Sequence, residues 1–389
     1  MPAIVALGLA VALAAPGCAG RSRNGTAVPP ASPAATASAQ PPVTSANPTT
    51  RPQPGTWRLL PAAPVPKGHY VGVWTGTEFI IDGANSSGGV LAAAYNPTSN
   101  TWRALPPSDY PVRTVQDGQH VAWDGTEMLT WGQTDAAYNP ATNQWRRLPE
   151  PPVRGSLITV WTGRQVLTWG GGCCDTAVGG GAAYDPVLDS WQPIPAGPLA
   201  ARIAPGAWTG TELIVVGGND FHGLLTDAAA YNPTTRSWRQ LPPLPTPQDG
   251  AAVVWTGAEV LVVGGLSSTK PGHYADNIAY NPTTNNWRRL PDTGIDRFQP
   301  NAVWTGSRLL VWGGATLPAN GQGNAGIPPH GVDYDPAGNS WSALPESPLR
   351  GRTGAVAVWT GTEMIIWGGL GIPNGVQSTD GAAYLPAAT

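Results

Sequence analysis

From residue 57 onward, short apolar runs alternate with polar turn residues, and the same order of runs and turns repeats along the chain. The clearest copy spans residues 207–241 and holds four apolar runs. Its second run, Leu213 to Val216, is continuously apolar and largely β-branched, which predicts a strand buried on both faces. Gly217-Gly218 ends this strand, and Asn232-Pro233 ends the third run, because proline cannot continue a central strand. The unit is therefore predicted to be four short antiparallel strands joined mostly by tight turns.

One such meander cannot bury both of its faces, so neighbouring copies must stack. Three aromatic positions mark the copies, and each occurs seven times. The tryptophan before the first turn is found at Trp74, Trp123, Trp161, Trp208, Trp255, Trp304 and Trp359. The tyrosine of the third strand is found at Tyr95, Tyr138, Tyr184, Tyr231, Tyr280, Tyr334 and Tyr384. The tryptophan of the fourth strand is found at Trp57, Trp102, Trp145, Trp191, Trp238, Trp287 and Trp341.

The three series are out of phase, because the repeats begin with a fourth strand at Trp57 and end after a third strand at Tyr384. The N-terminal strand around Trp57 can therefore complete the last copy and close a ring without an unpaired edge. The fourth-strand tryptophans recur at intervals of about 43 to 54 residues, close to the roughly 40–50 residues of propeller repeats. The sequence predicts an all-β, seven-bladed β-propeller with four-stranded antiparallel blades over residues 57–389.

The repeat resembles the kelch family. The matching motifs are Gly217-Gly218 after the second strand, Tyr231-Asn232-Pro233 and the following Trp238. The resemblance covers residues 57–389, with departures at Gly83-Ala84, Gly132-Gln133 and Leu385. It implies a propeller of the galactose oxidase/kelch-like superfamily, which includes sugar oxidases, sugar epimerases and protein-binding adaptors, so it does not select a function.

Residues 1–56 differ from the repeats in composition. Residues 1–18 resemble a lipoprotein-type signal peptide, with a short apolar run that ends at Ala15-Pro16-Gly17-Cys18. Residues 19–56 are rich in Pro, Ala, Ser and Thr, which predicts a disordered tether. We therefore expect a bacterial protein outside the cytoplasm, anchored to the membrane by a lipid on Cys18. The basic residues are almost all arginine, with lysine only at Lys67 and Lys270, which suggests a high-GC genome and an actinobacterium-like source. Secretion without lipidation is the alternative.

The net charge of −3 gives no electrostatic case for nucleic acid, and no zinc spacing, dinucleotide fingerprint or nucleophile elbow is present. The sequence predicts no metal and no cofactor. It favours a monomer without catalytic activity and leaves an enzyme as the alternative.

The predicted strand order divides the loops between two faces of the ring. The repetitive face carries the short first-to-second and third-to-fourth turns, and the variable face carries the second-to-third loops and the blade-to-blade connections. Basic side chains recur about seven residues before the first-strand tryptophans, or close to that place, which puts them near the channel mouth of the variable face. They are Lys67, Arg113, Arg154, Arg202, Arg297 and Arg352. They could bind an anionic or polyhydroxylated ligand, or they could pair with loop carboxylates and carbonyls.

Histidines and cysteines add two further candidates on the variable face. His69 and His273 share a Gly-His-Tyr context and could contribute to a ligand site or lie as polar residues under loops. Cys173 and Cys174 are adjacent in a glycine-rich loop, where oxidation outside the cytoplasm would join them in a disulfide.

Two functional hypotheses remain open. The first is a membrane-tethered binding module that recognises a cell-envelope glycan, an anionic small molecule or a protein through its variable face. The alternative is a carbohydrate-active enzyme, either epimerase- or mutarotase-like or a divergent sugar oxidase, with its site at the channel mouth. A purely structural envelope protein is a third hypothesis.

Overall fold

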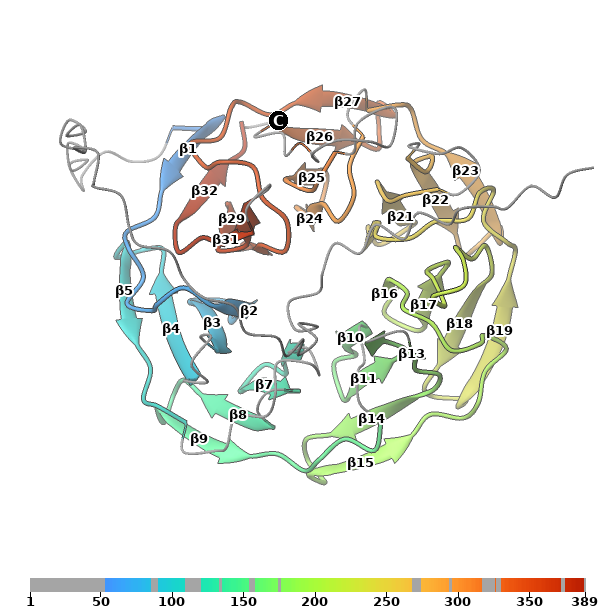
Figure 1. Ribbon diagram of the computed structural model, residues 1–389, viewed down its shortest axis with the longest axis horizontal. Helices are drawn as coiled ribbons and strands as arrows, with labels where there is room; N and C mark the ends of the chain where they lie inside the picture. Colours follow the sequence, from blue (N-terminus) through green and yellow to red (C-terminus); the bar gives the residue numbers. More distant parts are fainter. Residues whose placement is uncertain are drawn as a thin grey trace, which may run out of the picture. The chain divides into compact units, whose positions relative to one another are not determined.

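A computed structural model describes residues 53–84, 90–108, 120–132, 135–153, 158–173, 176–267, 274–293, 296–316, 326, 330–371 and 375–387. The chain divides into two units, Met1–Arg51 and Pro52–Thr389, and all the described residues belong to the second. Every regular element among the described residues is a β-strand, and these strands form seven four-stranded sheets in a ring (Figure 1). No helix in the described part of the chain is long and apolar enough to cross a membrane.

Each blade is an antiparallel sheet, and in blades one to six the strands follow one another in chain order from the channel to the rim. Blade one contains β2 (His69–Trp74), β3 (Phe79–Ala84), β4 (Val90–Asn96) and β5 (Thr101–Ala104). Blade two contains β6 (His120–Trp123), β7 (Met128–Trp131), β8 (Ala136–Asn139) and β9 (Gln144–Arg147). Blade three contains β10 (Ile158–Trp161), β11 (Val166–Trp169), β14 (Gly181–Asp185) and β15 (Ser190–Pro193). Blade four contains β16 (Gly206–Trp208), β17 (Leu213–Val216), β18 (Ala228–Asn232) and β19 (Ser237–Leu241).

The remaining blades repeat this order, and two small hairpins are added in loops. Blade five contains β20 (Ala252–Trp255), β21 (Val260–Val263), β22 (Ile278–Asn281) and β23 (Asn286–Arg289). Blade six contains β24 (Asn301–Trp304), β25 (Leu309–Trp312), β26 (Gly331–Asp335) and β27 (Ser340–Ala343). Blade seven contains β28 (Val356–Trp359), β29 (Met364–Trp367), β32 (Gly381–Leu385) and β1 (Thr56–Leu59). The hairpins pair β12 (Gly172–Cys173) with β13 (Thr176–Ala177), and β30 (Leu370–Gly371) with β31 (Val376–Gln377).

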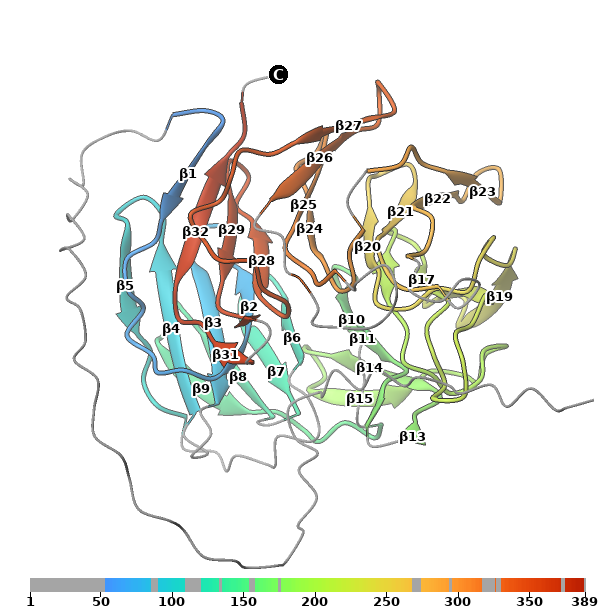
Figure 2. The same ribbon diagram turned by 45° about the horizontal axis from the view of Figure 1, so that its top comes forward.

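The ring closes through β1, which lies beside β32 in both views (Figures 1 and 2). Trp57 is the register partner of Tyr384, as every fourth-strand tryptophan is the partner of the tyrosine in its own blade. The N-terminal strand is therefore the outer strand of blade seven. The predicted seven-bladed architecture and its mode of closure are confirmed.

The hydrophobic core lies between adjacent blades. The second strand of blade four, Leu213–Val216, is fully buried, as its apolar run predicts. Leu213 and Val215 face blade three, where they share a cluster with Leu167 and Trp169. Ile214 and Val216 face blade five. The second strands are thus covered on both sides, which is why successive residues of these strands are buried without alternation.

All seven junctions between blades carry the same hydrogen bond. The indole Nε1 of each fourth-strand tryptophan donates to the carbonyl of the proline that ends the outer strand of the preceding blade, at 2.8–3.0 Å. The closing junction follows the rule, since Trp57 donates to Pro345. The repeated Leu-Pro or Ile-Pro after each outer strand is explained by this bond: the aliphatic residue is buried and the proline carbonyl accepts the indole proton.

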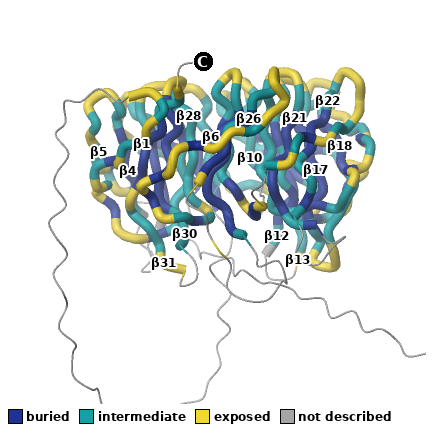
Figure 3. Tube along the Cα trace, turned by 90° about the horizontal axis from the view of Figure 1, so that it is seen from above, coloured by how far each residue is buried: buried dark blue, intermediate teal, exposed yellow. Residues whose placement is uncertain are grey.

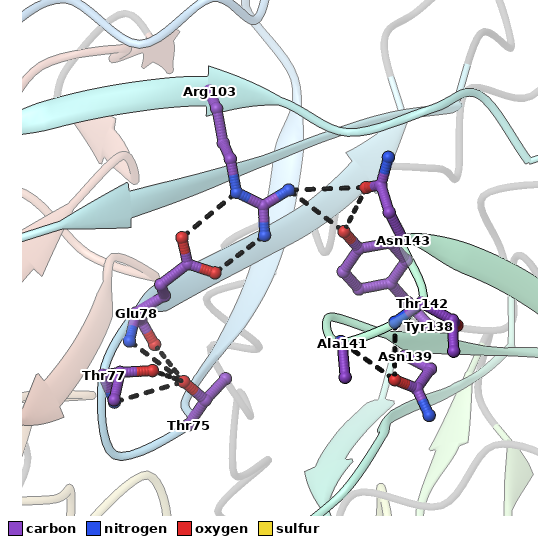
Figure 4. Close-up of polar contacts among 9 residues, drawn as sticks. All are labelled: Thr75, Thr77, Glu78, Arg103, Tyr138, Asn139, Ala141, Thr142 and Asn143. Atoms are coloured by element: carbon purple, nitrogen blue, oxygen red, sulfur yellow. Dashed lines mark hydrogen bonds and ion pairs between the residues drawn. The ribbon is translucent and has the colours of Figure 1, made fainter.

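A polar network ties blades together on the repetitive face (Figure 4). Arg103 of blade one pairs with Glu78 of the same blade at 2.7 Å and donates to the Tyr138 hydroxyl of blade two. The Tyr138 hydroxyl in turn donates to Asn143 at 2.7 Å. Equivalent arginine–glutamate–tyrosine arrangements surround Arg58, Arg146, Arg239 and Arg288. Blades three and six replace both members of the ion pair, which shows that the pair changes together.

Candidate functional site

The two faces of the ring differ as the strand order predicts (Figure 3). Exposed short turns follow one face, whereas the hairpins β12–β13 and β30–β31 lie on the other. On this variable face, blade-to-blade connections pair with the loops that follow second strands. The backbone bridges are Ile203 with Asn219, Asp249 with Leu266, Phe298 with Ala315, and Thr353 with Leu370. We call these paired segments, which belong to blades four to seven, the collar.

A buried side chain fixes each collar segment to its own blade. In blade six, the Arg297 guanidinium donates to the carbonyl of Gly313, the first glycine of the Gly-Gly pair. Gln248 occupies the same place in blade five and donates to the Gly264 carbonyl. The four donor–acceptor distances are 3.3 Å for Arg202 to Gly217, 2.7 Å for Gln248 to Gly264, 2.6 Å for Arg297 to Gly313 and 3.1 Å for Arg352 to Gly368. Each side chain thus caps the end of a second strand.

The backbone of the same residue links this blade to the preceding one. The Arg352 carbonyl accepts from the N–H of Gly314, the second glycine of blade six, at 3.1 Å. The three equivalent bonds are Gly171 to Arg202, Gly218 to Gln248, and Gly265 to Arg297. Gly313 has a φ of 69°, and a Cβ on it would lie 2.8 Å from the Arg352 carbonyl oxygen. The Gly-Gly pair of one blade and the arginine or glutamine of the next blade are therefore joined by backbone hydrogen bonds. We call this arrangement, in which the side chain of the same arginine or glutamine also binds the first glycine of its own blade, the interblade lock.

This lock accounts for three of the predicted ligand-binding residues. Arg202, Arg297 and Arg352 are only 1–2% exposed. Arg202 pairs with Asp227 at 2.5 Å and Arg352 with Asp380 at 2.7 Å. Their guanidinium groups have partners inside the fold, which is the alternative to ligand binding that the sequence left open.

Arg297 differs from its two counterparts because no carboxylate pairs with it in the described part of the chain. Its second guanidinium donor binds the His330 carbonyl at 2.7 Å, and its Nε has no hydrogen-bond partner. Burial lowers the pKa of Arg297 to about 10. Among the described residues, the Arg297 guanidinium thus donates to backbone carbonyls alone.

The other predicted residues fall into two groups. Lys67 is exposed on the variable side of blade one, and His69 is half-buried at the start of β2. The His69 Nε2 lies 2.8 Å from the Gln377 side-chain nitrogen of β31, and burial lowers the pKa of His69. The remaining positions, Arg113, Arg154, His273, Cys18 and Cys174, lie outside the described residues. Cys173 belongs to β12, but its side chain is not among those described.

Blade one departs from the lock. Its first two strands continue to the register pair His69–Ala84, where blades three to seven have the Gly-Gly turn. Asp82 is fully buried at a position that other blades fill with Trp131, Trp169 or Trp367. Burial and the charge of Asp82 raise the pKa of Tyr70 to about 12.

Blade two adds His120, which begins the neighbouring first strand, β6. Burial lowers the pKa of His120 to about 4, so its imidazole is neutral at pH 7. We call the group formed by His69, Tyr70, Asp82, His120 and Gln377 the polar sector. Sequence reasoning found only His69 in it. The sequence feature that could have pointed to its other members is the loss of the Gly-Gly pair in blades one and two, at Gly83-Ala84 and Gly132-Gln133.

The closed seven blades, the Gly-Gly locks and the tyrosine–tryptophan pairs define a kelch-type β-propeller. The chain belongs to the Attractin/LZTR1 β-propeller family, whose model matches residues 125–372. No curated protein matches the sequence significantly.

Two solved structures share the fold. The structure of YjhT superposes with a TM-score of 0.55 at 18% identity, covering 83% of this chain and 95% of YjhT. A fungal alcohol oxidase of the AA5 family, solved in complex with copper, superposes with a TM-score of 0.64 at 14% identity. That match covers 86% of this chain and 77% of the oxidase. At these identities the likeness concerns the fold alone.

A copper site can be sought among the residues that the structure describes. Within them, no three His, Cys, Asp or Glu side chains lie close enough to share a metal ion. The described residues therefore do not fit the metal of the fungal oxidase, and we derive no chemical step through copper.

Proposed function

We propose that this propeller is an exported, membrane-tethered binding module that holds a cell-envelope glycan on its variable face. The observation that supports the proposal is the difference between the two faces. The repetitive face repeats one turn and one polar network, whereas the variable face carries the collar, an additional layer of paired loops. Variable loops on a rigid scaffold are where binding surfaces are usually placed.

The buried locks favour binding because they order the collar before a ligand arrives. Loops that are already ordered lose less conformational entropy on binding, which improves affinity without new contacts. A side chain such as Arg352, which joins Gly368 and Asp380 of its own blade, holds the loop at both ends. The collar is therefore suited to present fixed side chains to a ligand.

The polar sector favours a neutral, polyhydroxylated ligand over an anionic one. Arg202, Arg297 and Arg352 are buried, and Lys67 is exposed. Neutral imidazoles at His69 and His120 each offer one donor and one acceptor, which suits sugar hydroxyls. Tyr70 stays protonated over the physiological range because its pKa is about 12.

Export and tethering are inferred from residues 1–56, which lie outside the described residues. The full-length chain, expressed in a bacterial host, should incorporate an alkyne-labelled fatty acid and fractionate with the membrane. Cys18→Ser should lose the label and appear in the soluble extracytoplasmic fraction. Equal membrane association of the unlabelled variant would overturn the lipid anchor.

Binding is tested by thermal unfolding of residues 52–389 against a panel of neutral and acidic oligosaccharides. A ligand present at a hundred times its Kd stabilises the folded state by about 2.7 kcal/mol. His69→Ala and Gln377→Ala should weaken binding at least tenfold, whereas Thr211→Ala, an exposed residue of the repetitive face, should not. If no oligosaccharide binds and a captured protein does, the ligand class is a protein instead.

A carbohydrate-active enzyme is the second candidate, because the fungal alcohol oxidase has the same fold. The oxidase form requires a bound metal, so metal analysis of the purified protein addresses it directly. The epimerase or mutarotase form would accelerate anomer exchange of a sugar, which NMR measures. Absence of both properties would remove this candidate and leave the binding module.

A further inference from the structure

One collar loop holds an aromatic side chain in a conformation that aromatic residues rarely adopt. Phe221, between β17 and β18 of blade four, has a φ of 69° and is 39% exposed. Six of the eight described non-glycine residues with positive φ occupy the same place in the repeated third-to-fourth turn, and five of those six are Asn or Asp. Phe221 is the one apolar residue among the eight. Strained residues of this kind persist only where the surrounding structure holds them, and they cluster at functional sites.

Hydrogen bonds on both sides of Phe221 hold the strained conformation. The Asp220 carboxylate accepts from the N–H groups of His222 and Gly223, both at 2.9 Å. Hydrogen bonds from these two N–H groups lower the pKa of Asp220, so the carboxylate is charged at pH 7. The loop tip therefore has a defined shape without any contribution from the phenyl ring.

The base of the loop is tied to two neighbouring segments. The Asn219 side-chain amide donates to the Asp249 carboxylate of the next connection at 2.7 Å. The Asn219 backbone bridges to Ile203, which precedes blade four. The Phe221 ring itself rests near Gly172 of β12, since a Cβ on Gly172 would lie 3.3 Å from the ring. The collar thus supports Phe221 from three sides and leaves it exposed.

The surroundings of Phe221 are polar. His222 and Gly223 are exposed beside it, and Asp220 is half-buried. The other exposed large hydrophobic residues among those described are Leu59, Val187, Leu188 and Val376, which belong to other blades. Protein-binding hot spots are ringed by further contacts that exclude water, and among the described residues no other exposed large hydrophobic side chain belongs to this loop. A single aromatic ring among hydrogen-bonding groups suits a sugar, which has an apolar C–H face and a hydroxyl edge.

We propose that Phe221 is a stacking platform for a neutral glycan with equatorial hydroxyls, and that Asp220 and His222 bind hydroxyls at its edge. Such a glycan, for example a β-1,4-linked N-acetylglucosamine chain, exposes its C–H groups on a flat face. This inference rests on the proposed function and names the contact residue of the same face. It also explains the strain, because asparagine or glycine would fit the backbone better than phenylalanine.

The test measures binding and stability in the same variants of residues 52–389, with the β-1,4-linked pentamers of N-acetylglucosamine and of glucose as probes. Phe221→Asn should weaken pentamer binding at least tenfold while the Tm stays the same or rises by one or two degrees. Phe221→Trp should bind within twofold of the wild type. Leu188→Asn, which removes an exposed apolar side chain from the repetitive face, is the matched control and should change neither quantity.

The outcomes separate this inference from the proposed function. If the wild type binds a pentamer and Phe221→Asn binds it equally well, the stacking platform is refuted and the binding module stands. If Phe221→Asn lowers the Tm by several degrees together with binding, Phe221 is a packing residue and the inference is also refuted. If the wild type binds neither pentamer, this inference fails. If it also binds no other glycan and no protein, the proposed binding module is refuted as well.

Discussion

Equivalent positions in blades five, six and seven allow one physical argument to be tested within a single molecule. Gln248, Arg297 and Arg352 make the same bond to the first glycine of their blade. Arg352 also has a carboxylate partner, Asp380, whereas Arg297 has none in the described part of the chain. We therefore expect Arg352→Gln to destabilise the fold and Arg297→Gln to be nearly neutral, because Gln248 shows that glutamine can make the shared bond.

The expected changes in the free energy of unfolding depend on how well the positive charge of each arginine is compensated in the fold. The difference between the usual arginine pKa of 12.5 and the value of about 10 at Arg297 corresponds to about 3 kcal/mol against the charged form. Replacing Arg297 by glutamine removes that penalty but loses the bond to the His330 carbonyl, which contributes about 1.5–3 kcal/mol. The net change lies between about zero and about 1.5 kcal/mol in favour of the variant, so Arg297→Gln should be neutral or slightly stabilising. Arg352→Gln loses its bonds to Asp380, and since that carboxylate side chain is 56% exposed and can be rehydrated, we expect about 2 kcal/mol.

Urea unfolding of residues 52–389 at pH 7 measures both changes, with equal m values as the check that the native and unfolded states are comparable. The midpoint should fall for Arg352→Gln and stay close to that of the wild type for Arg297→Gln. Equal losses in the two variants would refute the reasoning, because they would show that the backbone bonds alone carry the stability of the lock. A loss of more than about 2 kcal/mol in Arg297→Gln would do the same.

Two further predictions concern single groups. Trp102→Phe removes the indole donor to the Pro61 carbonyl and should cost about 1 kcal/mol in urea unfolding, whereas Trp74→Phe, whose indole makes no hydrogen bond within the described residues, should show no such hydrogen-bond loss. His120, with its pKa lowered to about 4, should make the fold lose about 2–3 kcal/mol as the pH falls from 6.5 to 4, because only the unfolded chain takes up the proton over that range. The ΔG of unfolding of His120→Asn should depend less on pH there, and an unchanged slope would contradict the lowered pKa.

The sequence predicts the ring because its information is periodic. Trp57 and Tyr384 stand at opposite ends of the chain, yet their places in the repeat require that they pair, and they do. The candidate site could not be predicted in the same way, because an arginine before a first strand has the same spacing whether it binds a ligand or a carbonyl. The polar sector was missed because His69 and Gln377, which are 308 residues apart in the sequence, meet only when β2 of blade one lies beside the β30–β31 hairpin of blade seven.

Blade six shows which feature of the repetitive network matters, the ion pair or its individual residues. Arg308 stands where five of the other six blades have a glutamate, and Ser342 where those five have an arginine. Asp333, on the strand between them, replaces alanine and binds Arg308 at 3.2 Å. Asp335 also binds Arg308, at 3.4 Å. The pair is thus kept with its charges exchanged.

If the ion pair stabilises the blade whichever strand carries the arginine, a variant with the usual glutamate–arginine arrangement should regain the free energy of unfolding that Arg308→Glu alone removes. Arg308→Glu alone leaves three carboxylates together, two of them Asp333 and Asp335, and should cost about 1–2 kcal/mol, since the pair is partly exposed. Adding Ser342→Arg and Asp333→Ala rebuilds the arrangement of Glu78 and Arg103 and should return the ΔG of unfolding to within about 1 kcal/mol of the wild type. Urea unfolding of the single, double and triple variants measures the coupling between the three positions. Losses that simply add would show that the sites act independently, whereas recovery in the triple variant would mean that an ion pair of either orientation stabilises blade six.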